Sequence, residues 1–178
     1  LVMQRGVKIG YWQGNPLLLT DDIQKLKPTL LATVPRILDR VYDKIQSTLN
    51  SSGWVSRKIF EQAYAIKKSG LAKGLQAPWC DWLVFDKIKQ ALGGRLKLVL
   101  SSGAPLRPEV QEFISVAFGA SVSQAYGLTE ISGAGFEQLT NDFSFGHVGS
   151  VVPCNEVKLV SVPEMNYFND ANPPAGEV

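Results

Sequence analysis

The apolar positions of the chain recur at helical spacing in several segments. One stripe begins after Pro35 and consists of Ile37, Leu38, Val41, Ile45 and Leu49, which lie three or four residues apart. Residues 54–73 and 81–92 show similar spacing, and a shorter helix is expected to begin at Thr20, an N-cap residue before two acidic residues. In the segment 81–92 we expect one buried side, formed by Trp82, Phe85, Ile88 and Leu92.

Short apolar runs between these helices predict strands. Residues 7–11 suit a strand and its turn, and residues 29–34 form an apolar run, closed by Pro35, that indicates a buried strand. Residues 96–100 are the most strand-like run of the chain. Helices and strands together predict an α/β fold.

The middle of the chain has the order strand, small-residue loop, helix, strand. The loop 101–106 follows the strand-like run, Pro108 begins a helix that Gly119 ends, and Val122 stands near the end of a further short strand. This order predicts a parallel β-α-β unit. Because the carboxyl ends of parallel strands meet at one edge of a sheet, loops 101–106 and 124–130 are expected to face one cleft.

Residues 124–130 read Gln-Ala-Tyr-Gly-Leu-Thr-Glu and combine several ligand-binding groups in what we interpret as a turn. Tyr126 can stack on a base, and Gly127 lets the backbone approach a ligand closely. The hydroxyl of Thr129 can donate to a phosphate, and Glu130 can hold Mg²⁺, which prefers hard oxygen ligands. The alternative is a glycine-containing loop that leads into a helix and half-buries Tyr126.

Composition is that of an ordinary globular chain, with 45% hydrophobic residues, 19% charged residues and a formal charge of +2. No apolar run is long enough to span a membrane, and no basic run interleaved with aromatics indicates nucleic acid as a partner.

Cys80 and Cys154 stand far apart, which argues against a disulfide framework and a zinc site. The single histidine, His147, is interpreted as a loop residue rather than a general base. Basic residues within 54–73 suit either an anionic membrane surface or a solvated helix face.

Five motifs in the same order resemble the adenylate-forming superfamily, and in particular its long-chain acyl-CoA synthetases, with plant-type members nearest. Residues 124–130 are similar to the family pattern Q-G-Y-G-[LM]-T-E, and residues 102–106 to [SG]-[GA]-A-P-L. The remaining matches are L-K-P-T with V-P-R-I-L-D-R-V-Y near residues 27–42, G-Y-W-Q-G at 10–14, and G-x-V-G-x-x-V-P with S-V-P-E-M and G-E within 146–177. The resemblance covers nearly the whole chain.

This resemblance implies that ATP and Mg²⁺ activate a long-chain fatty acid as acyl-AMP, from which CoA then displaces AMP. It implies that Tyr126 stacks on adenine, Thr129 binds a phosphate oxygen and Glu130 coordinates Mg²⁺. Thr129 and Glu130 would thus be the catalytic residues. The adenine side would be lined by Ser102, Gly103 and Ala104, and the acyl-adenylate pocket by Gln124, Ala125, Gly127 and Leu128.

The chain departs from the family pattern in three ways, and one of them, Ile131-Ser132-Gly133 in place of a commoner T/S-C-A, is expected only to tune packing. Ala125 stands where the family usually has glycine, which either narrows the pocket or is harmless if the backbone keeps a negative φ. The T-S-G-T-T-G-x-P-K-G phosphate loop, the hinge and the C-terminal domain with its adenylation lysine are not found in the sequence. Residues 1–178 are therefore expected to be an internal fragment of the large N-terminal AMP-binding domain, a mostly parallel sheet with flanking helices. Alone they are not expected to catalyse the full reaction.

Two other functions stay open at this point. One is a catalytically silent nucleotide-binding module, and the other is a membrane-surface adaptor built on residues 54–73. For the full-length protein, the resemblance implies an intracellular, membrane-associated location at the endoplasmic reticulum, peroxisome or plastid, without deciding among them.

Overall fold

The computed structural model describes residues 6–71 and 78–178 and has the expected α/β architecture. One sheet of five strands runs in the order β1-β2-β3-β4-β5. The strands are β1 (Leu30–Thr33), β2 (Leu98–Ser102), β3 (Ser121–Leu128), β4 (Gly133–Glu137) and β5 (Ser150–Val151). The first three pair in parallel, as the β-α-β pattern predicts, whereas β4 and β5 are antiparallel and make the sheet mixed.

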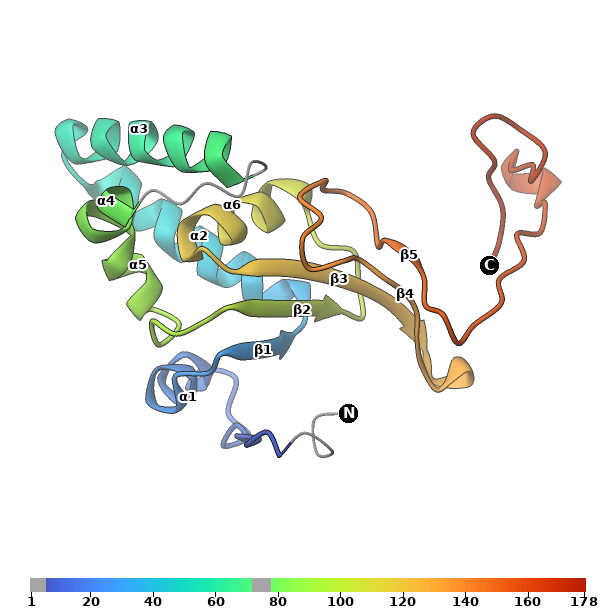
Figure 1. The fold of residues 1–178 in the computed structure, drawn as a ribbon, viewed down its shortest axis with the longest axis horizontal. Coiled ribbons are helices and arrows are strands. Elements are labelled where there is room, and N and C mark those ends of the chain that lie inside the picture. Colours follow the sequence, from blue (N-terminus) through green and yellow to red (C-terminus); the bar gives the residue numbers. More distant parts are fainter. Residues whose placement is uncertain (1–5, 72–77) are drawn as a thin grey trace.

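Helices α2, α3 and α6 lie together on one side of the sheet, and α1 lies beyond β1 (Figure 1). The helices are α1 (Leu19–Leu26), α2 (Pro35–Ser51), α3 (Trp54–Leu71), α4 (Pro78–Cys80), α5 (Asp86–Gln90) and α6 (Pro108–Phe118). None of the helices in the described ranges is both long and apolar enough to cross a bilayer. The predicted end of α3 at Lys73 falls outside the described residues.

Proline begins the two helices that pack on the sheet. Pro35 and Pro108 occupy the first turns of α2 and α6, where the missing N–H costs no helical hydrogen bond. At the other end of α6, Gly119 adopts a left-handed conformation with φ 62°, which ends the helix as predicted. The chain then enters β3 directly, so α6 is the crossover between β2 and β3.

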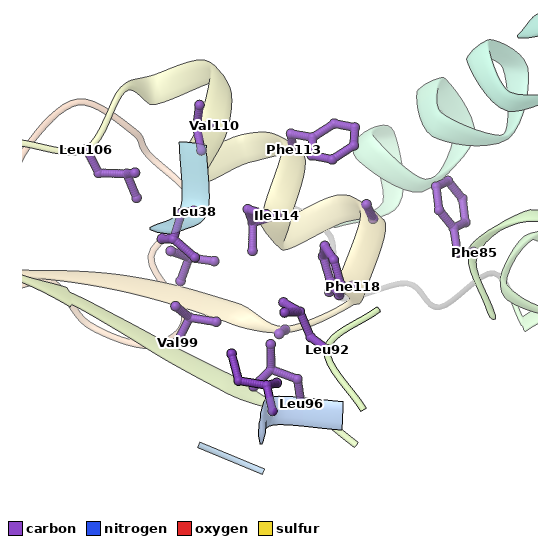
Figure 2. Close-up of a cluster of buried hydrophobic side chains, with 14 of the residues drawn as sticks. Leu38, Phe85, Leu92, Leu96, Val99, Leu106, Val110, Phe113, Ile114 and Phe118 are labelled. Carbon is purple, nitrogen blue, oxygen red and sulfur yellow. The ribbon is translucent and has the colours of Figure 1, made fainter. Parts of the chain in front are cut away.

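The core lies between the sheet and this helical layer (Figure 2). Leu38 from α2, Val99 from β2, and Val110 and Ile114 from α6 have no exposed surface. Burying an aliphatic side chain of this size contributes about 1.5–3 kcal/mol. These contacts fix α6 against the two central strands, and thereby fix the loops on either side of α6.

Three predictions near the N-terminus are wrong in detail. Residues 7–11 form no strand. Just after them, the backbone and side-chain N–H groups of Gln13 donate to Asp22 over 3.1 and 2.8 Å. Leu18 rather than Thr20 precedes α1. The strand within residues 29–34 forms as β1, but it is only half-buried, with Leu30 49% exposed, because β1 is the edge of this sheet.

The segment 81–92 is helical, but its faces differ from the prediction. A π-turn, η2 (Asp81–Phe85), separates α4 from α5 and adds one residue to a turn, which shifts the phase of the side chains. Phe85 and Leu92 are buried as expected, whereas Trp82 is 79% exposed.

An ion cluster holds this irregular segment against α3. The Asp81 carboxylate lies 2.5 Å from Lys67 Nζ and 3.1 Å from Lys89 Nζ, and Lys67 Nζ stands 4.6 Å from the centre of the Phe85 ring. Burial lowers the pKa of Lys67, and Asp81 opposes this effect without reversing it. Burial alone would raise the pKa of Asp81, but hydrogen bonds from the two lysines hold it below its usual value.

Asp81→Asn should destabilise the protein because it leaves Lys67 buried without a counter-ion. We expect a loss of about 2–3 kcal/mol, less than the cost of about 3–5 kcal/mol for a fully buried pair, since the Asp81 side chain is 26% exposed. Urea unfolding of the full-length protein measures it. Asp86→Asn is the matched control, because the Asp86 side chain is mostly exposed and its carboxylate lies as far as 4.0 Å from Lys89 Nζ.

The same pair predicts a pH dependence. Because the folded-state pKa of Asp81 is lowered, its contribution is complete above the unfolded pKa of about 4 and is lost as the pH falls through the folded value. As the pH falls below about 4, the difference in stability between wild type and Asp81→Asn should shrink. A difference that stayed constant over this range would contradict the assignment.

Candidate functional site

The two loops expected to carry ligand groups leave the same edge of the sheet. Ser102 at the end of β2 pairs with Ala125 of β3 in a parallel register. After this pair, β2 turns away while β3 continues to Leu128. Residues 102–105 and 126–130 are exposed, and we name them together the candidate edge.

The loop after β2 presents backbone rather than bulky side chains. Gly103 has φ 86°, a conformation that favours glycine. Apart from its chain neighbours, the one atom of the described residues within 4 Å of an added Cβ would be Val34 Cγ1, at 4.0 Å. At the end of the loop Leu106 is buried, and its backbone N–H donates to Gln124 Oε1 over 2.9 Å. The loop is therefore open where a ligand could approach and anchored where it rejoins the core.

The motif 124–130 is not the turn that its sequence suggests. β3 extends through Leu128 because it forms a hairpin with β4, a strand that the sequence pattern does not predict. The pairing shifts register after Tyr126, so that Tyr126 opposes Phe136 while Gly127 opposes Ala134. Such bulges increase local twist and re-aim side chains, often beside active sites.

Beyond Ala125 the backbone of β3 has a strand partner on the β4 side only, within the described part of the chain. The peptide groups of residues 126–128 on the β2 side are thus not used by the sheet. Because residues 126–128 are exposed, these peptide groups are accessible to water or to a ligand. A ligand seated between loop 102–105 and this end of β3 could hydrogen-bond to them.

The candidate side chains of this edge are accessible. Tyr126 is 38% exposed and packs edge-on against Phe136, with ring centres 5.9 Å apart. Thr129 and Glu130 stand exposed on a 3-10 turn, η3 (Thr129–Ile131), which Ser132 ends at φ 58°. Ala125 lies in extended strand without positive φ, so the backbone tolerates its methyl group.

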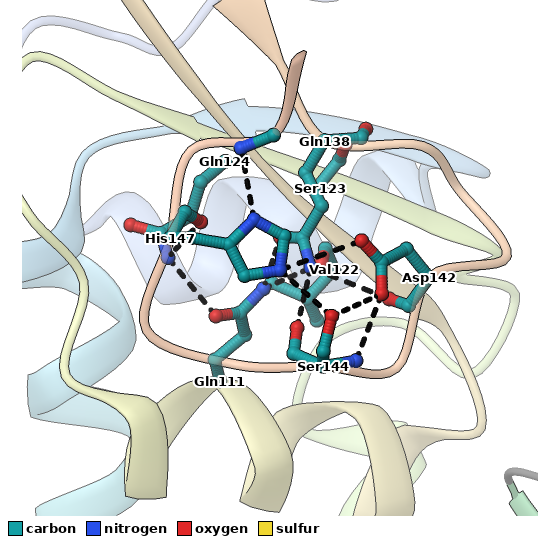
Figure 3. Close-up of polar contacts among 9 residues, drawn as sticks. Gln111, Val122, Ser123, Gln124, Gln138, Asp142, Ser144 and His147 are labelled. Carbon is teal, nitrogen blue, oxygen red and sulfur yellow. Dashed lines mark hydrogen bonds and ion pairs between the residues drawn. The ribbon is translucent and has the colours of Figure 1, made fainter. Parts of the chain in front are cut away.

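Unlike the exposed residues of the candidate edge, Gln124 has a buried side chain. It belongs to a row of three hydrogen-bonded amides, Gln124, Gln111 and Gln138, which we name the amide chain (Figure 3). Gln124 Nε2 donates to Gln111 Oε1 over 3.0 Å, and Gln111 Nε2 donates to Gln138 Oε1 over 2.7 Å. Gln138 Nε2 donates to the Ser144 carbonyl over 2.6 Å. Strand β3, helix α6 and the loop after β4 are joined in this way.

The direction of the amide chain is fixed by its two ends. The Leu106 N–H can only donate to Gln124, and the Ser144 carbonyl can only accept from Gln138. Each amide between them must therefore turn its oxygen towards Leu106 and its nitrogen towards Ser144. Flipping one amide would place donor against donor on one side and acceptor against acceptor on the other.

The loop 142–147 contains an aspartate, a serine and a histidine, but they are not arranged for nucleophilic catalysis. Ser144 Oγ and Asp142 Oδ2 both approach His147 Nε2, at 2.8 and 3.4 Å, while Nδ1 accepts the Gly149 N–H over 3.0 Å. A triad needs the carboxylate and the hydroxyl on opposite ring nitrogens. Hydrogen bonds from the hydroxyl and N–H of Ser144 also lower the pKa of Asp142. His147 is a loop residue here, as expected.

Sequence reasoning misses Gln111 and Gln138, both of which are fully buried. Gln111 lies among apolar residues of α6, and a polar residue at a core position is the one signal that could have marked it. For metal binding, the described residues hold no group of three or more His, Cys, Asp or Glu side chains. Glu130 can therefore supply a single carboxylate ligand.

The whole chain, residues 1–178, matches the family model described as AMP-binding enzyme. It is 46% identical over 176 residues to the peroxisomal long chain acyl-CoA synthetase 7 of Arabidopsis thaliana, covering 97% of this chain and 25% of that protein. It is 41% identical to fatty acyl-CoA synthetase A of Dictyostelium discoideum, covering 97% of this chain and 26% of that protein. The chain thus spans about a quarter of the length of these relatives.

Among solved structures, the fold is similar to that of the A-PCP didomain of a carboxylic acid reductase from Segniliparus rugosus in complex with AMP. The TM-score is 0.59 and the sequence identity 29%, over 94% of this chain and 20% of that one. The adenylation domain of a carboxylate reductase from Mycobacterium chelonae is also similar, with TM-score 0.56 and 26% identity, over 90% of this chain and 21% of that one.

Gly127→Ala should destabilise the hairpin that forms the candidate edge. An added Cβ would stand 2.0 Å from the Gly133 carbonyl oxygen, which is backbone and cannot rotate away. We expect a loss of about 2 kcal/mol or more, measured by thermal unfolding of the full-length protein. Gly53→Ala is the control, because an added Cβ there would meet no other described residue within 4 Å apart from its chain neighbours. Equal losses in the two variants would contradict the close approach.

Proposed function

The chain belongs to the AMP-binding enzyme family, and on that premise we propose that it forms one wall of the ATP and acyl-adenylate site of a long-chain fatty acid CoA ligase. The observation that carries this proposal is the candidate edge, where loop 102–105 and residues 126–130 leave neighbouring strands side by side. The carboxyl ends of parallel strands are where α/β sheets bind ligands. The acyl-CoA synthetases similar to this chain support the choice of substrate.

The proposed reaction has two steps. The carboxylate of the fatty acid attacks the α-phosphorus of ATP, an oxygen–phosphorus bond forms, and pyrophosphate leaves. The thiol of CoA then attacks the acyl carbon, a thioester forms, and AMP leaves with the former carboxylate oxygen. No side chain of this segment has to act as a nucleophile, so its contribution is to position reactants and stabilise charge.

The candidate edge and the two residues before Tyr126 provide the adenine and acyl-adenylate contacts of this proposal. Tyr126 presents a ring face to adenine, and the Phe136 ring packs against the Tyr126 ring in an edge-to-face arrangement. Backbone of Ser102, Gly103 and Ala104 lines the adenine side, where the open space at Gly103 permits close approach. Ala125, Gly127 and Leu128 line the acyl-adenylate with their backbone. Gln124 belongs to the same segment, but its buried amide contributes by holding loop 102–106.

Thr129 and Glu130 serve the phosphates. Both are exposed on η3, directly after the strand end, so the Thr129 hydroxyl can donate to a phosphate oxygen. A single carboxylate suits Mg²⁺, which usually takes one or two carboxylates together with phosphate oxygens and waters. Mg²⁺ held by Glu130 would neutralise charge that develops on the phosphates.

Because the chain spans about a quarter of its relatives, the complete activity is proposed for the full-length protein. Other segments would supply the remaining walls, among them a phosphate loop, a catalytic lysine and the CoA site. Two of the similar synthetases carry peroxisomal in their names, which favours the peroxisome among the three compartments considered.

The membrane-adaptor alternative is weakened by the environment of the basic residues of α3. Lys67 is buried against Asp81, Arg57 pairs with Glu61, and Lys68 pairs with Glu112. Membrane contact of the full-length protein stays a separate prediction, which co-sedimentation with anionic vesicles measures. We expect Lys58→Glu on α3 to leave the bound fraction unchanged, and a clear drop would restore the adaptor hypothesis.

Glu130→Ala should abolish most activity of the full-length protein. Losing a group that stabilises transition-state charge normally costs about 10² or more in rate, and Glu130 is the proposed protein ligand of Mg²⁺. Pyrophosphate release with fatty acids of graded chain length is the assay. Glu61→Ala, which removes an exposed glutamate on helix α3, is the control. If Glu130→Ala kept activity within about twofold of wild type, the metal assignment would be wrong.

A further inference from the structure

The amide chain contacts loop 102–106 through Gln124, and its three members are buried, so a ligand at the candidate edge would not contact them directly. We infer that Gln111 and Gln138 are positioning residues for nucleotide binding, acting through Gln124 on loop 102–106. This inference rests on the proposed function, and it assigns a role to two residues outside every motif that points to the family.

Gln124 links the amide chain to the loop. Gln124 Oε1 accepts the Leu106 N–H, the side-chain hydrogen bond that ties the end of loop 102–106 to β3. This bond exists only when the oxygen of the amide, and not its NH₂ group, faces Leu106. The two orientations of a glutamine amide have nearly the same shape, so packing alone does not choose between them.

Gln111 is one of three groups that orient Gln124, together with the Leu106 N–H and the His147 carbonyl. Its Oε1 accepts from Gln124 Nε2, which favours the orientation in which the oxygen of Gln124 faces Leu106. Gln111 itself cannot turn, because its Nε2 donates to the Val122 carbonyl over 3.0 Å and to Gln138 Oε1. Since Gln111 has no exposed surface, its effect on a ligand has to be indirect.

Gln138 closes the amide chain into a ring. Its Nε2 donates to the carbonyls of Ser144 and Asp142, and the same loop returns to Gln124 through the His147 carbonyl, which accepts from Gln124 Nε2 over 3.2 Å. Loop 142–147 and loop 102–106 are therefore held by the same three amides. Hydrogen bonds in such a ring strengthen one another and are lost together.

The test compares steady-state kinetics of the full-length protein with its variants. Gln111→Met keeps the side-chain volume but removes the nearer of the two acceptors of Gln124 Nε2. Gln138→Met removes the next member while sparing the bond between Gln111 and Gln124. We expect Gln111→Met to raise the KM for ATP about tenfold or more, because a displacement of about 1 Å at a positioned group can cost about 10². Gln138→Met should have a smaller effect in the same direction, and the KM for CoA should stay within about twofold in both.

Val116→Ala separates positioning from stability, because Val116 is equally buried on the same helix but forms no part of the amide chain. It should lower the melting temperature without raising the KM for ATP. The double variant Gln111→Met/Gln138→Met should recover part of the lost stability, since replacing both partners of a buried bond by apolar groups costs less than replacing one. Its KM for ATP should stay high.

Three results would overturn the inference. An unchanged KM for ATP in Gln111→Met shows that the loop does not need the oriented amide. A KM that follows the melting temperature across all four variants shows that the amides serve stability only. If the wild-type protein releases no pyrophosphate with any fatty acid, both the proposed function and this inference are wrong. That result would be known from the wild type alone, before any variant is compared.

Discussion

The arrangement of the candidate site depends on one constraint, the need of buried amides to pair every donor with an acceptor. Gln111, Gln124 and Gln138 are buried, and an unpaired buried polar group costs about 1–3 kcal/mol. Only one orientation of all three satisfies both the Leu106 N–H and the Ser144 carbonyl. Core packing therefore fixes where α6 lies, and the amide chain fixes how the loops around it are set (Figure 3).

The second feature that shapes the site is the unequal length of neighbouring strands. β2 ends at Ser102, whereas β3 is carried three residues further by its hairpin with β4. As a result, residues 126–128 have a strand partner on the β4 side alone within the described residues. The Tyr126 ring lies at the start of this stretch, and the hydroxyl of Thr129 and the carboxylate of Glu130 follow it on a 3-10 turn. Rigid strands thus support a short exposed segment, which is the arrangement that precise binding sites need.

Much of this can be predicted from the sequence, and the failures have identifiable causes. Proline correctly marks the start of α2 and α6 because it fixes φ, and Gly119 marks the end of α6 because glycine readily adopts positive φ. The extension of β3 is missed because it depends on pairing with a glycine-rich β4, a long-range contact that no local pattern encodes. Trp82 is misplaced because a π-turn changes the helical phase. The amide chain is missed because its members come from α6, from β3 and from the residue that follows β4, and only Gln124 lies in a recognisable motif.

The most direct test of the central claim is a crystal structure of the full-length protein with AMP bound. We expect adenine against Tyr126, flanked by the backbone of residues 102–104, with Gln124 Oε1 still accepting from the Leu106 N–H. The AMP phosphate should lie towards Thr129. Nucleotide density away from the candidate edge, or a Gln124 amide turned out of the chain in the complex, would contradict this expectation.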